Sequence, residues 1–358
     1  MSDPRPVLFV TNHAPPFRVG AFAALHAREE VAFALIGGRV RHGGGAGAGR
    51  PLPFPVLHCA QKTIYRLAAS GRFRAVVAGL SGRLAPAAAW AGARRAGVPF
   101  VLWATMWAHP RTPAHALSYL PVRHLYRHAD AVVTYGPHVS AYVEGKGAPG
   151  PVLVAPQSVD GAFWEAPTPA RRLAPFQVCF AGRLQAEKGA AVLAGAWRRT
   201  GLQAPEAALA VAGHGPLSDE LLQAGATVLG ASSLRSVRAL YAGSDVVVLP
   251  SLATRAFREP WGLTVNEAFH RGVPVVASDA VGAVAGGLLR DGHNGVVVPA
   301  GSAAALAAAL VRLHDDPLMR GRLGAAARRS VKTHSHQAWS AGMSRALASV
   351  GASRTVVA

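Results

Sequence analysis

The chain of 358 residues is long enough for two domains, each with its own hydrophobic core. Apolar residues make up 51% of it, which excludes a disordered protein. Its two cysteines, Cys59 and Cys179, lie far apart beside apolar neighbours, as buried thiols in a reducing compartment do. The start MSDPRPVLFV lacks the pattern of a signal peptide, and no apolar run reaches the roughly 18 residues of a membrane span. These features predict a globular cytoplasmic protein.

The charge is strongly positive, at +19, and is unevenly distributed. Residues 31–129 contain no Asp or Glu but thirteen Lys and Arg residues. The arginine excess is also what a GC-rich coding bias would produce. An acid-free stretch of this length nevertheless predicts a positive electrostatic field over the first domain, because positive and negative charges ordinarily alternate on a protein surface. We expect an anionic partner, with a membrane surface first, a phosphorylated acceptor next and nucleic acid well behind.

The first half begins with a strand over residues 7–10, a loop holding Arg18 and Gly20, and a helix over 21–28. This order predicts the first unit of a doubly wound sheet, whose ligands lie at the carboxyl ends of the strands. A glycine-rich surface loop is expected over residues 41–51. Residues 61–73 have the pattern of an amphipathic helix, packed on the sheet or lying on a membrane. Its polar face or the residues just after it carry Lys62, Arg66, Arg72 and Arg74.

Histidines in the first half raise two questions. A buried strand ends in a cluster with Trp107 and His109, a position that favours substrate contact, although a histidine at the rim of the core fits equally well. His124 and His128 have the helical spacing of a metal pair. With no acidic or cysteine ligand nearby, a solvated helix face is the better interpretation, and no metal site is predicted.

The second half places candidate ligand-binding residues where strands give way to turns. Arg183 and Lys188 stand at a strand-to-helix junction, where a diphosphate is readily bound. Gly213 and Gly215 form a turn that lets backbone approach a ligand closely.

The stretch 258–277 reads REPWGLTVNEAFHRGVPVVA and holds two carboxylates, Glu259 and Glu267. The turn that opens the helix after it leaves amide groups unpaired around Gly262, Leu263 and Thr264. Such a turn could bind the phosphate of a polyhydroxylated ligand, while the two glutamates accept hydrogen bonds from its hydroxyl groups. On spacing alone, a turn with two solvated glutamates explains the sequence equally well.

Strands alternate with helices throughout both halves, which predicts an α/β fold with two parallel sheets. We place a first domain at residues 1–168 and a second at 169–335. Residues 336–358 are expected to form a helix that packs back on the first domain.

Five segments in succession, FAGRLQAEKG, VAGHGPL, LRSVRALYAGSDVVVLPS, REPWGLTVNEAFHRGVPVVASD and LLRDGHNGVVVPAG, resemble the second domain of glycosyltransferase family 4. HADAVVTYGPHVSAYV and APQSVD match the first domain more loosely. The resemblance implies the GT-B fold, two Rossmann-like doubly wound domains facing a central cleft. It also implies a retaining enzyme that uses a nucleoside-diphosphate sugar and requires neither metal nor cofactor.

The resemblance assigns a role to each matching position. Arg183 and Lys188 are similar to the pair that neutralises the donor diphosphate, and Glu267 to the acceptor from ribose hydroxyls. Glu259 and His109 match groups at the donor sugar. The remaining expected contacts are backbone at Gly262, Leu263 and Thr264, the nucleotide pocket at Gly213 and Gly215, and the acceptor-side loop at Arg18 and Gly20.

Departures from the family pattern put the sugar and acceptor in doubt: Trp261 stands where Phe is usual and is expected to narrow the sugar pocket. The first hypothesis is transfer to a lipid-linked or glycan precursor at the cytoplasmic face of the membrane, with the protein peripheral there. A small-molecule acceptor, or a catalytically idle nucleotide-sugar-binding protein, is the alternative. No nucleic acid partner is expected.

Overall fold

The computed structural model describes residues 3–37 and 51–354 and divides the chain into two units. The first unit joins Met1–Asp160 to His334–Ala358, and the second is Gly161–Thr333. The division after Asp160 lies eight residues before the expected boundary at 168. The expected glycine-rich loop at 41–51 lies, except for Pro51, outside the described residues.

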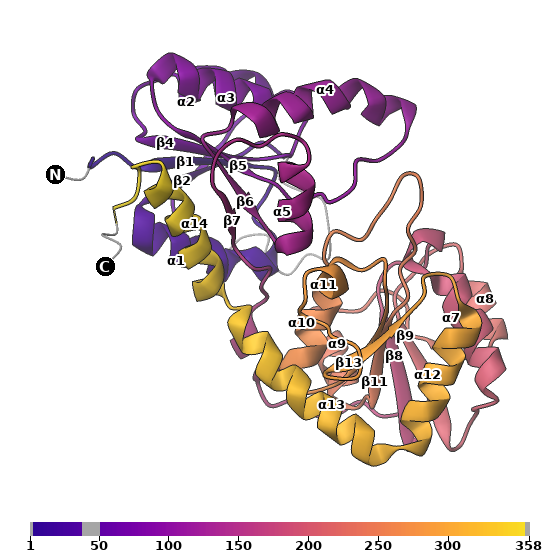
Figure 1. Ribbon diagram of the computed structural model, residues 1–358. Helices are drawn as coiled ribbons and strands as arrows, with labels where there is room; N and C mark the ends of the chain where they lie inside the picture. The colour runs from indigo at the N-terminus through magenta and orange to yellow at the C-terminus, as the bar shows by residue number, and fades with distance from the viewer. Residues whose placement is uncertain (1–2, 38–50, 355–358) are drawn as a thin grey trace. The chain divides into compact units, whose positions relative to one another are not determined.

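The described part of the first unit contains a parallel sheet with strand order β3-β2-β1-β4-β5-β6-β7 (Figure 1). Its strands are β1 (Val7–Thr11), β2 (Val31–Leu35), β3 (Val56–His58), β4 (Ala75–Gly79), β5 (Phe100–Trp103), β6 (Ala131–Thr134) and β7 (Val152–Val154). Most are short apolar runs buried on both faces, as parallel strands covered by helices must be.

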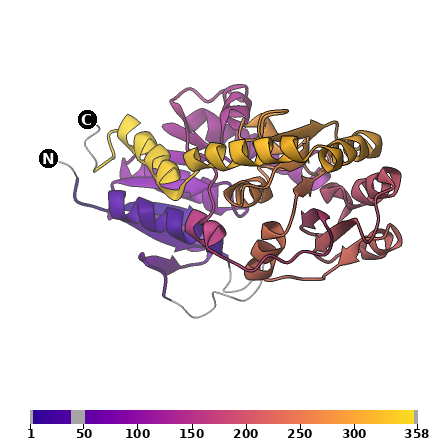
Figure 2. The ribbon, with the colours of Figure 1, turned by 90° about the horizontal axis from the view of Figure 1, so that it is seen from below.

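Helices cover both faces of this sheet. They are α1 (Pro16–Glu29), α2 (Ile64–Ala68), α3 (Ala85–Ala96), α4 (Pro113–His128), α5 (Pro137–Glu144) and α14 (His336–Ser349). Figures 1 and 2 show α14 alongside α1, although the two are separated by most of the sequence. Trp339 of α14 is fully buried, with its ring 6.4 Å from Phe9 and 5.7 Å from Phe22.

Two predicted helices differ from the structure. Helix α1 begins at Pro16, not at residue 21, because a proline with its fixed φ is well suited to the first turn. The helix expected over 61–73 is one turn of 3-10 helix (Gln61–Thr63) and the short α2, and the chain turns at Gly71 with φ +72°. Arg74, expected on or just after the polar face of that helix, is buried and pairs with Glu29 at 2.9 Å.

The second unit has a parallel sheet with strand order β10-β9-β8-β11-β12-β13 in its described residues. The strands are β8 (Phe176–Ala181), β9 (Ala207–Ala212), β10 (Thr227–Val228), β11 (Val246–Leu249), β12 (Val275–Ser278) and β13 (Gly295–Val298). The helices are α6 (Gly161–Glu165), α7 (Ala190–Thr200), α8 (Ser218–Gln223), α9 (Leu234–Ala242), α10 (Leu263–His270), α11 (Gly282–Ala285), α12 (Ala303–Asp315) and α13 (Pro317–Ser330). Both units therefore have the predicted Rossmann-like architecture.

None of the helices in the described part of the chain combines the length and the apolar character needed to cross a bilayer. Across residues 3–37 and 51–354, no three His, Cys, Asp or Glu side chains are grouped so that they could hold a metal ion.

Candidate functional site

The strand order of the second sheet reverses direction at β8. The chain proceeds from β8 to β9 on one side and later returns to β11 on the other side of β8 (Figure 1). Loops that leave such a switch point at the carboxyl ends of the strands diverge, and ligands of doubly wound sheets bind there. The loops after β8 and β11 carry Lys188 and Glu259, so two predicted site residues lie at this position.

Lys188 and Glu259 form an ion pair, 71 residues apart in sequence. The Lys188 Nζ donates to Glu259 Oε2 at 2.5 Å, and the Ser251 hydroxyl donates to the same oxygen at 3.0 Å. The two side chains are only 18% and 9% exposed. Lys188 Nζ also lies 5.1 Å from the centre of the Phe257 ring. A cation and a carboxylate are thus held together in a partly desolvated site, where charge acts more strongly than in water.

Backbone contacts fix the two loops that carry this pair. Gly189 has φ +74°, and a Cβ there would lie 1.9 Å from the carbonyl oxygen of Pro250. The Leu252 amide donates to the Glu187 carbonyl at 2.9 Å. Only a glycine permits this approach, so the turn after β8 packs directly on the segment after β11.

Gly213 and Gly215 follow β9 and pack against the loop after β8. A Cβ at Gly213 would lie 1.8 Å from the Gly182 carbonyl oxygen, and one at Gly215 would lie 2.4 Å from that of Leu184. The Leu184 amide in turn donates to the His214 carbonyl at 3.0 Å. These glycines therefore bring the two loops together, and their contact with a nucleotide remains a prediction.

Arg183 lies on the same loop as Lys188 but faces solvent. Its side chain is 55% exposed, with Glu187 at 3.4 Å and Gln185 as a hydrogen-bond partner. An exposed ion pair of this kind contributes little to stability. The guanidinium can therefore exchange these contacts for an anionic ligand at small cost.

The turn before α10 requires glycine at position 262. Gly262 has φ +90°, and a Cβ would lie 2.6 Å from Leu249 Cδ2. The helix begins directly after it, so the amides of Leu263 and Thr264 have no acceptor within α10. Glu259 is attached to the same turn through its own carbonyl, which accepts from the Gly282 amide at 3.2 Å. The helix start and the Glu259 carboxylate are thereby held in one segment.

Trp261 does not have the expected role of narrowing the sugar pocket. Its side chain is 2% exposed, and its indole Nε1 donates to Asn266 Oδ1 at 2.7 Å. The large ring is directed into the protein because it fills the core beneath the turn, where it fixes the turn against α10.

Glu267 lies one turn into α10, and its surroundings shift the pKa of its carboxyl group. Burial raises the pKa of this carboxyl to about 7, and the neighbouring Tyr241 hydroxyl opposes the shift by favouring the ionised form. Burial and then the Glu267 charge hold the pKa of Tyr241 well above its ordinary value. Thr264 lies beside the same phenol. The carboxyl consequently changes charge near neutral pH.

The predicted residues of the first unit are divided between the core and a cavity. Arg18 is 3% exposed, with its guanidinium 5.1 Å from the Trp103 ring and 5.4 Å from that of Trp339. Burial lowers the pKa of Arg18. A Cβ at Gly20 would lie 2.3 Å from His336 Cδ2, so Gly20 lets α14 pack on α1. The structure thus shows both residues against α14, and a role in acceptor binding stays a prediction.

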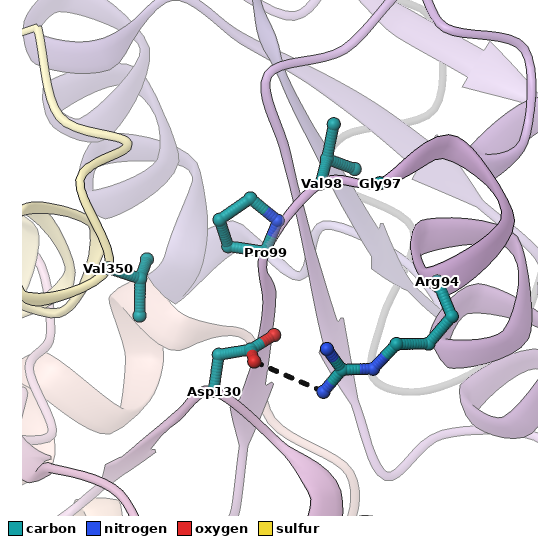
Figure 3. A pocket seen from close by; sticks show the side chains of 6 residues that line it. All are labelled: Arg94, Gly97, Val98, Pro99, Asp130 and Val350. Atoms are coloured by element: carbon teal, nitrogen blue, oxygen red, sulfur yellow. Dashed lines mark hydrogen bonds and ion pairs between the residues drawn. The ribbon is translucent and has the colours of Figure 1, made fainter.

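His109 lines a cavity of about 740 Å³ in the first unit. Its Nε2 donates to the His115 carbonyl at 2.7 Å, which fixes that nitrogen as protonated. Figure 3 shows another cavity of the same unit, about 460 Å³, lined by Arg94, Asp130, Pro99 and Val350. There the Arg94 Nη2 donates to Asp130 at 3.1 Å, so both charges are compensated.

Several residues at these positions were not found from the sequence. Ser251 donates to Glu259 from eight residues earlier in the chain, and Tyr241 of α9 lies beside Glu267; no spacing pattern identifies either residue. Gly189 is different, since it directly follows the Glu-Lys pair of the recognised segment and marks a turn that could have been predicted.

Comparisons with known proteins concern the family and the fold of the chain. The family model "Glycosyl transferases group 1" matches residues 175–316. A glycogen synthase of Mycobacterium tuberculosis is 29% identical over 214 residues, 57% of this chain and 50% of that protein. A D-inositol 3-phosphate glycosyltransferase of Arthrobacter sp. is 34% identical over 173 residues, 42% of this chain and 37% of that protein. The chain thus spans half or less of the length of these relatives.

Solved structures resemble both units. The Anabaena protein HepE, in complex with UDP and glucose, has a TM-score of 0.74 at 17% identity and covers 96% of this chain and 100% of its own. The sucrose-phosphate synthase of Thermosynechococcus elongatus has a TM-score of 0.73 at 16% identity, covering 95% and 98%. Residues 175–316 therefore resemble the group 1 glycosyltransferases, and the solved structures show that the chain has the GT-B fold.

Proposed function

We propose that the protein transfers a sugar from a nucleoside-diphosphate sugar to an acceptor, with retention of anomeric configuration and without a metal ion. The observation that carries the proposal is the Lys188–Glu259 pair at the switch point of the second sheet. The same loops carry the exposed Arg183 and lead to the start of α10, whose first amides have no acceptor within the helix. Cations and helix-start amides are the groups that bind a diphosphate.

In this mechanism the bond between the sugar C1 and the β-phosphate oxygen breaks, and the acceptor oxygen bonds to C1 on the same face. The departing phosphate oxygen takes the acceptor's proton. Lys188 and Arg183 stabilise the negative charge that grows on the leaving diphosphate, which is where a preorganised site lowers the barrier most. Glu259 accepts hydrogen bonds from the sugar hydroxyls, and Glu267 accepts them from the ribose.

Substitution of the pair tests the proposal. The Anabaena structures contain UDP, so UDP-sugars are the first donors to screen, by thermal shift. With a donor that binds, we expect Lys188→Met and Glu259→Gln each to lower kcat for transfer or donor hydrolysis by about 10²–10³-fold. Lys332→Met, which removes an exposed lysine elsewhere in the second unit, is the control and should leave kcat unchanged.

The results separate two functions. Unchanged turnover in both variants would refute the assignment of these residues. Tight binding of a nucleotide sugar with neither transfer nor hydrolysis in the wild type would favour the alternative, a catalytically idle binding protein.

For the acceptor we propose a lipid-linked or glycan precursor at the cytoplasmic face of the membrane, supported by the acid-free basic stretch 31–129. A small-molecule acceptor is the alternative. Flotation with anionic vesicles distinguishes them: binding at low salt that is lost at high salt supports the membrane, because salt screens exposed charges. Absence of binding at low salt would leave the small-molecule acceptor.

A further inference from the structure

The segment between β11 and α10 brings an aromatic ring, Phe257, against the lysine of the candidate site. Lys188 Nζ lies 5.1 Å from the centre of this ring. At such a distance the face of an aromatic ring attracts a cation electrostatically. The two residues come from different loops, since Lys188 follows β8 and Phe257 follows β11. Their contact is therefore made by the fold of the second unit and is not contained in one sequence motif.

Hydrogen bonds within the segment fix the position of Phe257. Residues 254–257 form a tight turn, in which the Thr254 amide donates to the Phe257 carbonyl at 2.8 Å. The Thr254 hydroxyl oxygen accepts from the Ala256 amide at 3.2 Å and from the Phe257 amide at 2.9 Å. Threonine side chains stabilise turns in this way. The backbone of Phe257 is consequently held through both its N–H and its C=O group.

The ends of the same segment meet at the ion pair of Lys188 and Glu259. At its start, the Ser251 hydroxyl donates to Glu259 Oε2 at 3.0 Å. At its end, the same oxygen of Glu259 accepts from Lys188 Nζ at 2.5 Å. Residues 251–259 thus form a loop that is closed on the ion pair. The Phe257 ring adds a second contact to the ammonium, next to the one that the carboxylate makes.

Packing in the core does not account for this ring. Phe257 is half-buried and does not belong to the core cluster that the described residues of the second unit form. The turn residues before it, Thr254, Arg255 and Ala256, are exposed. Because hydrophobic stabilisation grows with the apolar area removed from water, a half-buried ring at an exposed turn gains less from burial than a core phenylalanine does. The contact with Lys188 gives the ring a further role.

An aromatic ring restrains an ammonium group without neutralising it. A carboxylate compensates the charge of a cation, whereas a ring face attracts the ion and leaves its charge and its N–H donors in place. The lysine side chain is a point charge on a flexible four-carbon stem, so a second contact limits the positions that the ammonium can take. A restrained ammonium that keeps its charge suits a group that must meet a diphosphate at a fixed place.

We propose that Phe257 is a positioning residue, which holds the Lys188 ammonium where negative charge develops on the leaving diphosphate. Its role rests on the proposed function, in which Lys188 stabilises that charge. Phe257 acts through the lysine and not on the donor itself. A cation that is already in place when the sugar–phosphate bond breaks stabilises the transition state without having to move first.

Substitution of the ring tests this role in the whole protein, with UDP-glucose as the donor probe. Phe257→Leu keeps an apolar side chain but has no ring. We expect kcat for transfer or donor hydrolysis to fall about tenfold, because the ammonium is no longer held in place. The Kd of UDP-glucose should rise less than about threefold, since the charge of Lys188 is still present. Phe257→Tyr keeps a ring face and should have a kcat within about twofold of the wild type.

Phe163→Leu is the matched control. Phe163 is also half-buried in the second unit, and its ring faces another cation, with the Arg238 guanidinium 4.6 Å from the ring centre. This residue lies in α6, outside the loops that carry Lys188 and Glu259. Loss of its ring removes the same kind of contact elsewhere, so kcat should equal that of the wild type. Circular dichroism and the melting temperature show whether each variant is folded.

The deciding measurement is the effect of Phe257→Leu in a protein that already carries Lys188→Met. If the ring acts through the lysine, its removal should change kcat by less than about twofold once the ammonium is absent. A ring that only supports the fold would lower kcat equally in both backgrounds. A tenfold loss in the Lys188→Met background, or wild-type kcat in Phe257→Leu alone, would overturn the inference.

Failure of the proposed function gives a different pattern. Wild-type turnover in Lys188→Met would refute the role of the lysine, and the role of the ring with it. A strong loss of turnover in Lys188→Met together with wild-type kcat in Phe257→Leu would refute the role of the ring alone.

Discussion

The raised pKa of Glu267 predicts that donor binding depends on pH near neutrality. If Glu267 accepts hydrogen bonds from the ribose, its ionised form binds the donor better. With a pKa of about 7, roughly one tenth of the carboxyl is ionised at pH 6 and nine tenths at pH 8. Since affinity scales with the competent fraction, the Kd of UDP-glucose should be about tenfold higher at pH 6 than at pH 8. UDP-glucose is the probe because its diphosphate diester does not titrate in this range.

Isothermal titration from pH 6 to 8 measures this dependence in the wild type and in Glu267→Gln. The variant should bind weakly at every pH, with no slope. His214 is exposed in the glycine turn after β9 and is not the predicted partner of the ribose. His214→Gln should therefore keep the slope. A wild-type Kd that is constant from pH 6 to 8, or an equal slope in Glu267→Gln, would refute the reasoning.

The same shift predicts an effect on stability. A carboxyl whose pKa is raised on folding stabilises the folded state when protonated, and this contribution is lost as the pH rises from about 4.5 through 7. Glu267→Gln removes the penalty of ionisation. The substitution should accordingly raise the melting temperature more at pH 8 than at pH 6.

Substitutions at three contacts have consequences that follow from packing. Lys188→Met should lower the melting temperature, because it leaves the Glu259 carboxylate without its partner. Adding Glu259→Gln should recover part of the lost melting temperature without recovering sugar transfer. If the effects of the two substitutions on stability were additive, the pairing would be contradicted. Gly213→Ala places a methyl group against a carbonyl oxygen and should abolish donor binding measured by calorimetry. By contrast, Gly321 lies on a helix with open space around it, so Gly321→Ala should raise the free energy of unfolding by about 0.5–1 kcal/mol. Glu29→Gln leaves the buried charge of its arginine partner unpaired and should cost about 3–5 kcal/mol in urea unfolding; a loss near zero would show that the pair is dispensable.

The sequence was sufficient to predict the architecture and the position of Lys188 and Glu259. Both predictions depend on local signals, since apolar runs identify buried strands and the turn residues follow them directly. In a doubly wound sheet all these turns meet at one edge, so residues 71 apart could be assigned to one place without knowledge of the contacts.

What the sequence did not predict depends on contacts between distant segments. A tryptophan such as Trp261 suits a sugar pocket, and an arginine such as Arg74 suits a polar helix face. In the structure both side chains are buried in the core, which supplies each of them with a hydrogen-bond partner. Position 20 requires a glycine because a Cβ there would clash with His336, which lies more than 300 residues away in the sequence. The cavity around His109 is likewise assembled from three segments of the first unit, and none of them alone predicts its lining.

The packing of α14 on α1 has a consequence for synthesis of the chain. The second unit is one continuous segment, so it can fold as soon as Thr333 has left the ribosome. The first unit cannot, because Trp339 fills its aromatic core and the Ala352 carbonyl accepts from Arg74 at 2.8 Å. The half of the protein that is translated first is therefore expected to be the half that is completed last.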